Sequence, residues 1–565
     1  MKRIIGMFMA AAMMVGCSND NDPVLDNGNE GSTAYMSVKI MSDDSYGTRA
    51  ESPTPGMNDF DKNEEHKIEN IDFYFFDGNG NAFGLNANGN CVNVVPPTGE
   101  NDDNGESGDE NIEVKRTVLV LNKVNGLFPT RMVTIVNPVA RGAFAGMSFE
   151  KLKAEAAHYG KSAKADDYFV MTTSVYGEGG EGYTSITEKN LKSSKEEAKA
   201  DTKSAVKVYV ERILAKVGVE TQPKFSLNDG KWYAKMTGWT VTGAVLENTV
   251  TTTDAVEKPK EICYLVKNID SNWSDDKLGF SWNDVTRHRC YWANSPAGTF
   301  GYQFALNDFM QKEENAAETA EADPNLITNP KYFYEHTSSG NRSKLLVTFK
   351  YYSDKDCLKE VVPAEWNGTL YTQEDLKKAM ASSIQGKIGY IEGEELAGKS
   401  VKPIEDYITI QQSKREGTKQ YLSEAVFNSE KFLKSGNSIV LKGSDGNWKI
   451  VLNNTISDPE KTEAIENINA IMTDLLPEAK VWINGGYYYL DVKHLGKANS
   501  EAEYGVVRNH FYKYNITNVK GLGTPICNPD EIIKPQKPED DESFVEAELN
   551  ILSWRIVNHG DVTLE

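Results

Sequence analysis

Short runs that alternate apolar and polar residues, separated by turn residues, recur along most of this chain and constrain its fold more than any other feature. Residues 33–40 alternate in this way, and the run 71–76 ends in an Asp-Gly-Asn-Gly turn, a strong hairpin signal. Valine, isoleucine, threonine and aromatic residues, which favour strands, fill these runs. Helical spacing is confined to a few segments, such as 148–160 and 457–476. The pattern predicts a mainly β fold with two β-sandwich domains.

The chain has 565 residues, enough for two or three domains. The longest strand-like run, 204–220, leads us to expect that the first sandwich ends near Val219. Residues 354–480 mix short helices with weak strands and are interpreted as insertions in the second sandwich. Residues 528–544, rich in proline and acidic residues, are expected to form an extended linker before a last apolar segment, 545–565.

The N-terminus indicates export. Lys2 and Arg3 precede an apolar run that ends at Gly16 and is too short to span a bilayer, and Cys17 follows directly. This is the pattern of a bacterial lipoprotein signal, in which the cysteine is acylated, and residues 18–22 resemble the surface-export tag of Bacteroidota lipoproteins. Acyl chains would hold the protein at a membrane, since each buried methylene contributes about 0.8 kcal/mol. The alternative is an ordinary secretory signal with an incidental cysteine.

Charge and cysteine content exclude some classes of protein. The net charge of −22 argues against nucleic-acid binding, which needs a basic surface. Five cysteines besides Cys17 are widely spaced and odd in number, so a disulfide framework does not organise the fold. One bridge is possible, with Cys263 and Cys290 as the candidates.

No local motif predicts catalysis, a metal or a cofactor. The seven histidines lack zinc-ligand spacing, and no nucleophile elbow, phosphate loop or dinucleotide fingerprint occurs. Tyr291 and the tryptophans at 273, 282 and 292 are interpreted as core residues, with a sugar platform as the alternative. Paired carboxylates of a glycosidase need no local motif, so a glycoside hydrolase is the least favoured hypothesis. We expect that the protein is not an enzyme.

Two stretches resemble the fimbrillins of Bacteroidota, the subunits of major and minor fimbriae. The first is VKVYVERILAKV at 206–217, and the second is YGVVRNHFYKYNITNVKGLGTP at 504–525, of which Val506–Asn509 is the most specific part. GGYYYLDVKH before the second stretch and the last strand, LNILSWRIV, also look similar. Residues 354–480 and the acidic loop near 100–113 have no counterpart. The resemblance implies two sandwiches of a transthyretin-like type.

The resemblance also implies a route of assembly. A lipidated precursor reaches the outer membrane, an arginine-specific surface protease removes the N-terminal segment, and a strand from another subunit fills the groove that is left. Here the implied cut lies between Arg49 and Ala50, in an exposed loop after strand 33–40. Residues 1–16 would then be the signal peptide, 17–49 the propeptide with a removable strand, 50–219 the first sandwich and 220–527 the second.

The C-terminal end would supply the donor strand. Its apolar residues fall on two faces, with a bulge or bend near 551–552. The implied donor residues are Val545, Ala547, Leu549, Ile551, Trp554 and Ile556. A head-to-tail contact of this kind builds an open filament of identical subunits, joined with other fimbrial subunits and supporting adhesion at the cell surface. The other interpretation is that this segment is simply the last strand of the second sandwich.

Three alternatives remain at this stage. An anchor subunit would keep its lipid, and a tip subunit need not carry a donor strand. A surface glycan-binding lipoprotein would share the signal, the acidity and the sandwiches, but it would keep Cys17 and would not need a detachable tail. A shaft subunit accounts for both the cleavage loop and the tail.

Overall fold

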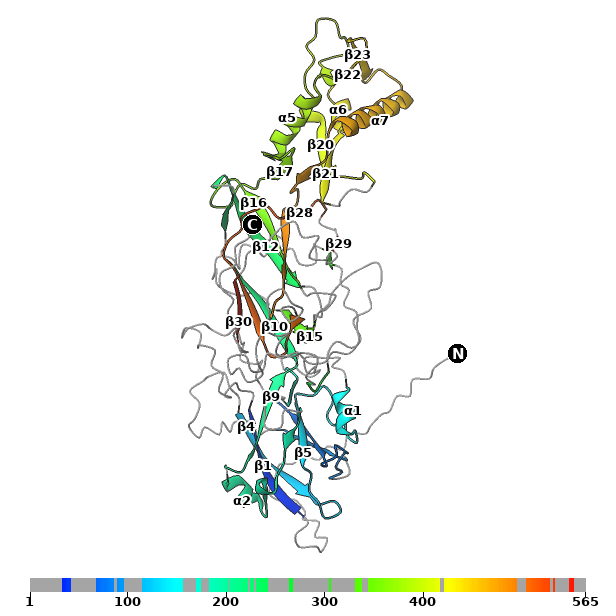
Figure 1. Cartoon of the computed structure of the whole chain (residues 1–565). Coiled ribbons are helices and arrows are strands. Elements are labelled where there is room, and N and C mark those ends of the chain that lie inside the picture. The colour runs from blue at the N-terminus through cyan, green and yellow to red at the C-terminus, as the bar shows by residue number, and fades with distance from the viewer. Residues whose placement is uncertain are drawn as a thin grey trace, which may run out of the picture.

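The structure is a computed structural model of the whole chain. It describes residues 33–41, 68–85, 89–95, 114–155, 169–173, 182–201, 203–221, 224–227, 230–241, 264–267, 304–305, 331–337, 344–416, 421–494, 505–528, 532–533 and 548–552. Within these ranges strands outnumber helices, so the prediction of a mainly β fold with helical insertions is confirmed. The described parts follow one another along a long axis, with an N-terminal sandwich, a C-terminal sandwich and an inserted module in line (Figure 1).

The N-terminal sandwich is a nine-stranded sheet, counted over the described residues, that folds around an apolar core. Its strand order is β3-β2-β5-β6-β9-β1-β4, with β7 beside β5 and β8 beside β1. Side chains of β1 and β4 meet those of β2 and β5 in the core, among them Met36, Leu119 and Phe73. The strands are β1 (Thr33–Met41), β2 (Ile71–Phe76), β3 (Cys91–Val94), β4 (Val114–Asn122), β5 (Arg131–Val136), β6 (Met171–Thr173), β7 (Thr184–Ser185), β8 (Leu191–Lys192) and β9 (Val206–Arg212). The helices are α1 (Phe149–Lys153), η1 (Glu188–Asn190) and α2 (Lys195–Ala200).

The C-terminal sandwich packs a four-stranded sheet on a five-stranded one, as far as the described residues show. The first sheet has the order β14-β10-β27-β30 and the second β11-β12-β16-β25-β28. Val217, Tyr512 and Ile516 of one sheet share a buried core with Phe349 and Tyr488 of the other. The first sheet contains β10 (Leu214–Thr221), β14 (Lys331–Tyr334), β27 (Phe511–Ile516) and β30 (Glu548–Leu552). The second contains β11 (Phe225–Leu227), β12 (Trp232–Val241), β16 (Lys344–Tyr352), β25 (Gly486–Asp491) and β28 (Thr524–Pro525).

Two short strand pairs complete this part of the chain. β13 (Phe304–Ala305) pairs with β29 (Ile532–Ile533), and β15 (His336–Thr337) pairs with β26 (Gly505–Val506). β29 lies inside the predicted linker 528–544, so part of that segment is attached to the body of the protein.

The inserted module, residues 363–482, has a core of its own. A five-stranded sheet in the order β18-β17-β24-β21-β20 carries α5 and α7, and a second sheet has the order β19-β22-β23. Ser457 and Glu460 form a capping box at the start of α7, within the segment 457–476 predicted to be helical. The strands are β17 (Pro363–Trp366), β18 (Thr369–Thr372), β19 (Ile388–Ile391), β20 (Ile408–Gln412), β21 (Leu422–Phe427), β22 (Ser438–Lys442), β23 (Trp448–Leu452) and β24 (Ala479–Val481). The helices are α5 (Gln373–Ile384), η4 (Glu405–Tyr407), α6 (Ser429–Leu433) and α7 (Asp458–Leu475).

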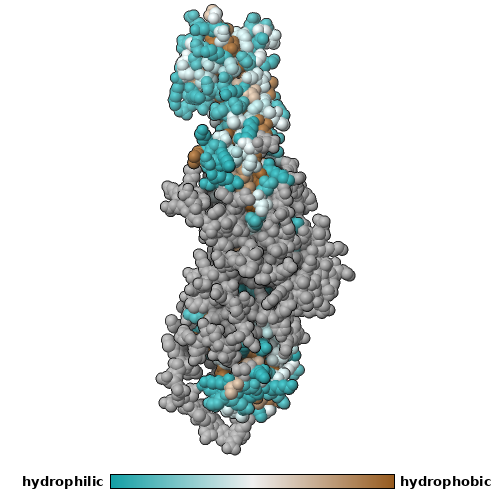
Figure 2. Space-filling model, turned by 90° about the vertical axis from the view of Figure 1, so that its left-hand side faces the viewer, coloured by the Kyte–Doolittle hydropathy of each residue, from teal (hydrophilic) through white to brown (hydrophobic). Residues whose placement is uncertain are grey.

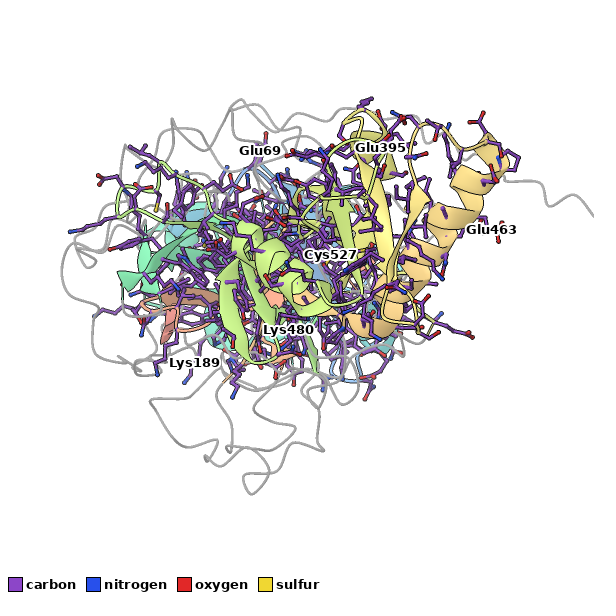
Figure 3. The ribbon with its side chains drawn as sticks, turned by 90° about the horizontal axis from the view of Figure 1, so that it is seen from above. Glu69, Lys189, Glu395, Glu463, Lys480 and Cys527 are labelled. Carbon is purple, nitrogen blue, oxygen red and sulfur yellow. The ribbon has the colours of Figure 1, made fainter. Side chains whose placement is uncertain are left out.

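The module is fixed to the C-terminal sandwich by hydrogen bonds rather than by a loose tether. Trp482 Nε1 donates to the carbonyl of Gly523 at 3.1 Å, and the hydroxyl of Ser423 in β21 lies 3.3 Å from the sulfur of Cys527. Viewed along the long axis, the module lies in front of part of the rest of the molecule, with Glu463 on the outer side of α7 (Figure 3). Its surface is largely hydrophilic with scattered hydrophobic residues (Figure 2).

Candidate functional site

Strand β1 lies in the interior of the N-terminal sheet rather than at its edge. It pairs antiparallel with β4 over its whole length, from Thr33 opposite Asn122 to Met41 opposite Val114. On its other side it pairs parallel with β9 from Val38 onward, and with β8 at Tyr35 and Met36. The backbone groups of β1 are therefore matched on both flanks, although the strand stands first in the described chain.

The side chains of β1 complete the core on one face. Ala34, Met36, Val38 and Ile40 are at most 5% exposed, and the last three belong to the core cluster of this sandwich. Removing such a strand would uncover apolar surface worth about 25 cal/mol per Å². Loss of β1 would thus leave an apolar slot between β4 and β9.

The other face of β1 is covered by a small flap, defined here as residues 191–201 with β8 and α2. Among described strands β8 pairs only with β1, and α2 packs against β1 and β4. Under this cover Ser37 is 3% exposed, although it points away from the core. A hydrogen bond from Lys192, 2.7 Å from the carboxylate, lowers the pKa of Asp201 and closes the flap at its end.

The two sandwiches are joined by an almost unbroken strand. β9 belongs to the N-terminal sheet and β10 to the C-terminal sheet, and only Ile213 separates them. β10 pairs parallel with β27, so residues 214–219, which the sequence assigned to the first sandwich, pair within the second. Ile213 and Leu214 are fully buried in a core cluster that also includes Phe511. The crossing point is therefore packed from both domains.

A buried ionic cluster lies beside this crossing. Arg508 Nε donates to Glu335 Oε2 at 2.6 Å, and Lys267 Nζ lies 3.2 Å from Glu335 Oε1. All three side chains are fully buried. Arg508 also donates to the carbonyls of Leu265 (2.9 Å) and Tyr264 (2.6 Å), so one guanidinium links three chain segments.

The charges of the cluster are held by mutual pairing. Desolvation alone would raise the pKa of the Glu335 carboxyl, but Lys267 and Arg508 outweigh it and the pKa is lowered. Breaking such a pair leaves uncompensated buried charge, which costs far more than losing a surface ion pair.

Asn509 turns the chain next to the cluster. Its backbone is left-handed, with φ 59°, a conformation in which asparagine is several-fold enriched. Its N–H donates to the carbonyl of Leu214 at 2.8 Å, and its Oδ1 accepts from Arg212 Nη1 at 3.2 Å. The two stretches singled out in the sequence, 206–217 and 504–525, therefore meet at the junction of the sandwiches.

Most of the predicted site residues lie outside the described residues. These are Cys17, Arg49, Ala50, Val545, Ala547, Trp554 and Ile556, and the proposed Cys263–Cys290 bridge lies outside as well. Leu549 and Ile551 lie in β30, opposite Tyr514 and Tyr512 of β27. In this structure β30 is thus paired within its own chain, and its role as a donor strand stays a prediction.

Sequence reasoning missed Glu335 and Lys267, which have no local motif and are distant from Arg508 in the chain. The one available signal was the segment Val506–Asn509, which contains the central arginine. Among the described residues no group of three or more histidine, cysteine, aspartate or glutamate side chains is placed to hold a metal ion. In the same ranges no helix is long and apolar enough to cross a membrane.

The geometry shows a first strand buried within its sheet and a strand shared by two sandwiches. The comparisons with known proteins add a family similarity for the C-terminal part of the chain. Residues 483–559 match the sequence model of the family described as major fimbrial subunit protein type IV, fimbrillin, C-terminal. This match confirms the resemblance to the fimbrillins for residues 483–559. No curated protein matches the chain.

Several solved structures are distantly similar. A protein described as a cell adhesion protein of Bacteroides eggerthii has 10% identity and a TM-score of 0.33, over 95% of this chain and 99% of its own. A cell adhesion protein of Parabacteroides distasonis has 9% identity and a TM-score of 0.36, over 93% and 99%. The tip fimbrial protein Mfa3 of Porphyromonas gingivalis, with a C-terminal truncation, has 10% identity and a TM-score of 0.25, over 92% and 100%. At TM-scores this low none of the three carries an argument.

Proposed function

We propose that this chain is a structural shaft subunit of a surface fimbria, without catalytic activity. It is exported as a lipoprotein acylated at Cys17, matured by cleavage after Arg49 and polymerised when the tail of one copy replaces β1 of the next. The observation that carries the proposal is the interior position of β1, because an interior strand that can be cut from its chain leaves a slot with two unpaired neighbours.

The position of the cleavage loop supports removal of β1. Arg49 follows β1 in the chain, so a cut after it separates residues 33–41 covalently from all the strands they pair with. What then holds β1 is backbone pairing with β4, β8 and β9 and the burial of its apolar side chains. Both are interactions that another strand of suitable pattern is able to make.

The tail supports the second half of the proposal. The match to the fimbrillin C-terminal family extends to residue 559 and so includes the implied donor residues between 545 and 556. The lipid at Cys17 would be a temporary tether to the outer membrane, lost with residues 17–49. The partners are then identical subunits in a filament, other fimbrial subunits and an arginine-specific surface protease.

The first test is the N-terminal sequence and intact mass of the protein sheared from the cells that make it. A start at Ala50, in material that runs as a detergent-resistant ladder, is the expected result. A start at an acylated Cys17, in monomers, would overturn the proposal. Deleting residues 545–565 is expected to abolish the ladder while leaving a folded, processed monomer.

A tip subunit is the second candidate, and one observation favours it. β30 pairs with β27 of its own chain, and a tip subunit has no need to donate its tail. Immunogold labelling of intact cells separates the two functions. Label along the whole filament identifies a shaft subunit, whereas label confined to filament ends identifies a tip.

A further inference from the structure

The strand to be displaced and the tail share a short sequence. Residues 36–40 are MSVKI, and residues 552–556 are LSWRI. The serine and the isoleucine are identical, the basic residue is Lys39 in one segment and Arg555 in the other, and the first and third positions are apolar in both. Both segments read in the same direction.

The environment of β1 gives each of these positions a physical requirement. Met36, Val38 and Ile40 are fully buried, so a replacement strand needs apolar residues there. Lys39 is half-buried, which suits a long side chain whose charged end reaches water. Ser37 is 3% exposed beneath the flap, so that position accepts only a small residue.

The tail meets these requirements in one register. Ser553 is the small residue between two apolar ones, and Arg555 and Ile556 follow it as Lys39 and Ile40 follow Ser37. Trp554 in the place of Val38 is the largest difference in volume, so neighbouring core side chains have to move to admit the indole.

We infer that residues 552–556 of one copy occupy the slot of residues 36–40 of the next, in the same direction and with Ser553 in the place of Ser37. The inference rests on the proposed function and adds the residue-by-residue register of the tail in the slot. The incoming strand then runs antiparallel to β4 and parallel to β9, as β1 does. Leu191 of the flap then pairs with Leu552 as it pairs with Met36 of β1.

With this register, Leu552 cannot pair with β27 of its own chain and occupy the slot of the next copy at the same time. In the present structure Leu552 lies opposite Phe511 in β27, and in the filament it takes the place of Met36. The strand therefore leaves its own sheet at this residue before it enters the slot.

A disulfide formed between copies tests the register. Ser37 lies opposite Val118 in β4, and opposed residues of antiparallel strands have Cβ atoms about 4.5–5.5 Å apart. Full-length chains carrying Val118→Cys are produced together with chains carrying Ser553→Cys, in the native cells. Filaments are expected to contain a disulfide-linked dimer that disappears on reduction. The matched control replaces Ser553→Cys with Asn550→Cys, three residues away, and is expected to give no dimer.

The outcomes separate this inference from the proposed function. If the Asn550→Cys pair forms the dimer, or neither pair does while filaments still depend on the tail, the register is wrong and donor-strand exchange stands. If filaments form without residues 545–565, the proposed function itself is wrong.

A pair of size changes gives a second test that needs no cysteine. Ser553→Tyr is expected to reduce the yield of filaments at least tenfold, because Ser37, whose place the tyrosine would take, is only 3% exposed. The matched control Ser382→Tyr makes the same change at an exposed serine of α5, away from the slot and the tail, and is expected to assemble like the unmodified chain. Equal amounts of processed monomer in the two variants verify that folding is unaffected. The reverse order of the two effects would overturn the register.

Discussion

Strand β1 and the Arg508 cluster are both buried, but they are held by different kinds of contact. β1 is held by backbone pairing on two flanks and by apolar side chains of ordinary size. The cluster is held by charged hydrogen bonds whose partners come from three separate chain segments. The first kind of contact is available to any strand of matching pattern, whereas the second is specific to these side chains. Strand β1 is therefore suited to exchange between copies, whereas the Arg508 cluster is suited to a permanent contact within one chain.

The largest expected effect is the loss of stability when the Arg508 cluster is disrupted. Glu335→Gln leaves Arg508 and Lys267 buried without a counter-charge, which costs about 3–5 kcal/mol. Urea unfolding followed by tryptophan fluorescence measures the loss. The matched control is Glu360→Gln, which removes a partly exposed pair with Lys350 at 3.2 Å and is expected to change stability by less than about 1 kcal/mol. Equal losses in the two variants would contradict a special role for the cluster.

A smaller loss of stability is expected from a change in strand β1. Met36→Ala removes a fully buried side chain and is expected to cost about 2–3 kcal/mol, within the range for methionine truncation in a core. The loss should be confined to the uncleaved precursor, because the mature chain no longer contains β1. Hydrogen exchange of β4 amides measures it, with half-buried Tyr35→Ala as the milder comparison. An identical loss in the mature form would show that β1 is retained.

The smallest expected effect concerns pH and applies to the junction alone. The pKa of Glu335 is lowered in the folded protein, so the unfolded chain binds a proton there more readily. The stability that this contributes is complete above the ordinary glutamate pKa and is lost as the pH falls through the lowered value. The triple variant Glu335→Leu, Arg508→Met, Lys267→Met should lack this part of the acid sensitivity. Thermal unfolding between neutral pH and pH 3 checks the difference between the two proteins.

The sequence predicted most of what rests on local pattern. Strand 33–40 and the helix at 457–476 were found because period-2 alternation and helical spacing are local properties. The transfer of strand 206–221 from one sheet to the other was not found, because the strand-like run continues past Ile213 and only the pairing partners change. The independent core of the inserted module also depends on contacts between distant strands, such as β17 with β24.

For the candidate site, too, local features were predicted from the sequence and contacts between distant segments were not. The cleavage loop and the tail were proposed through a family resemblance carried by residues 206–217 and 504–525. That those two stretches meet at the junction, with Glu335 and Lys267 supplied from elsewhere, follows from the fold and has no local signature. Burial of charge is a tertiary property, so no composition or spacing along the chain reveals it.

The unbroken run of β9 and β10 has a mechanical consequence. β1 lies alongside β9, and β10 continues in the same line through the junction to β27. A strand seated in the β1 slot and pulled along the filament would therefore load its hydrogen bonds in shear, many at once, instead of peeling them one by one. The tension would pass through a single polypeptide segment, which Asn509 holds at Arg212 and Leu214, rather than across a hinge. Force spectroscopy on single filaments should accordingly find stiff extension with abrupt rupture, and a gradual lengthening at low force would contradict this load path.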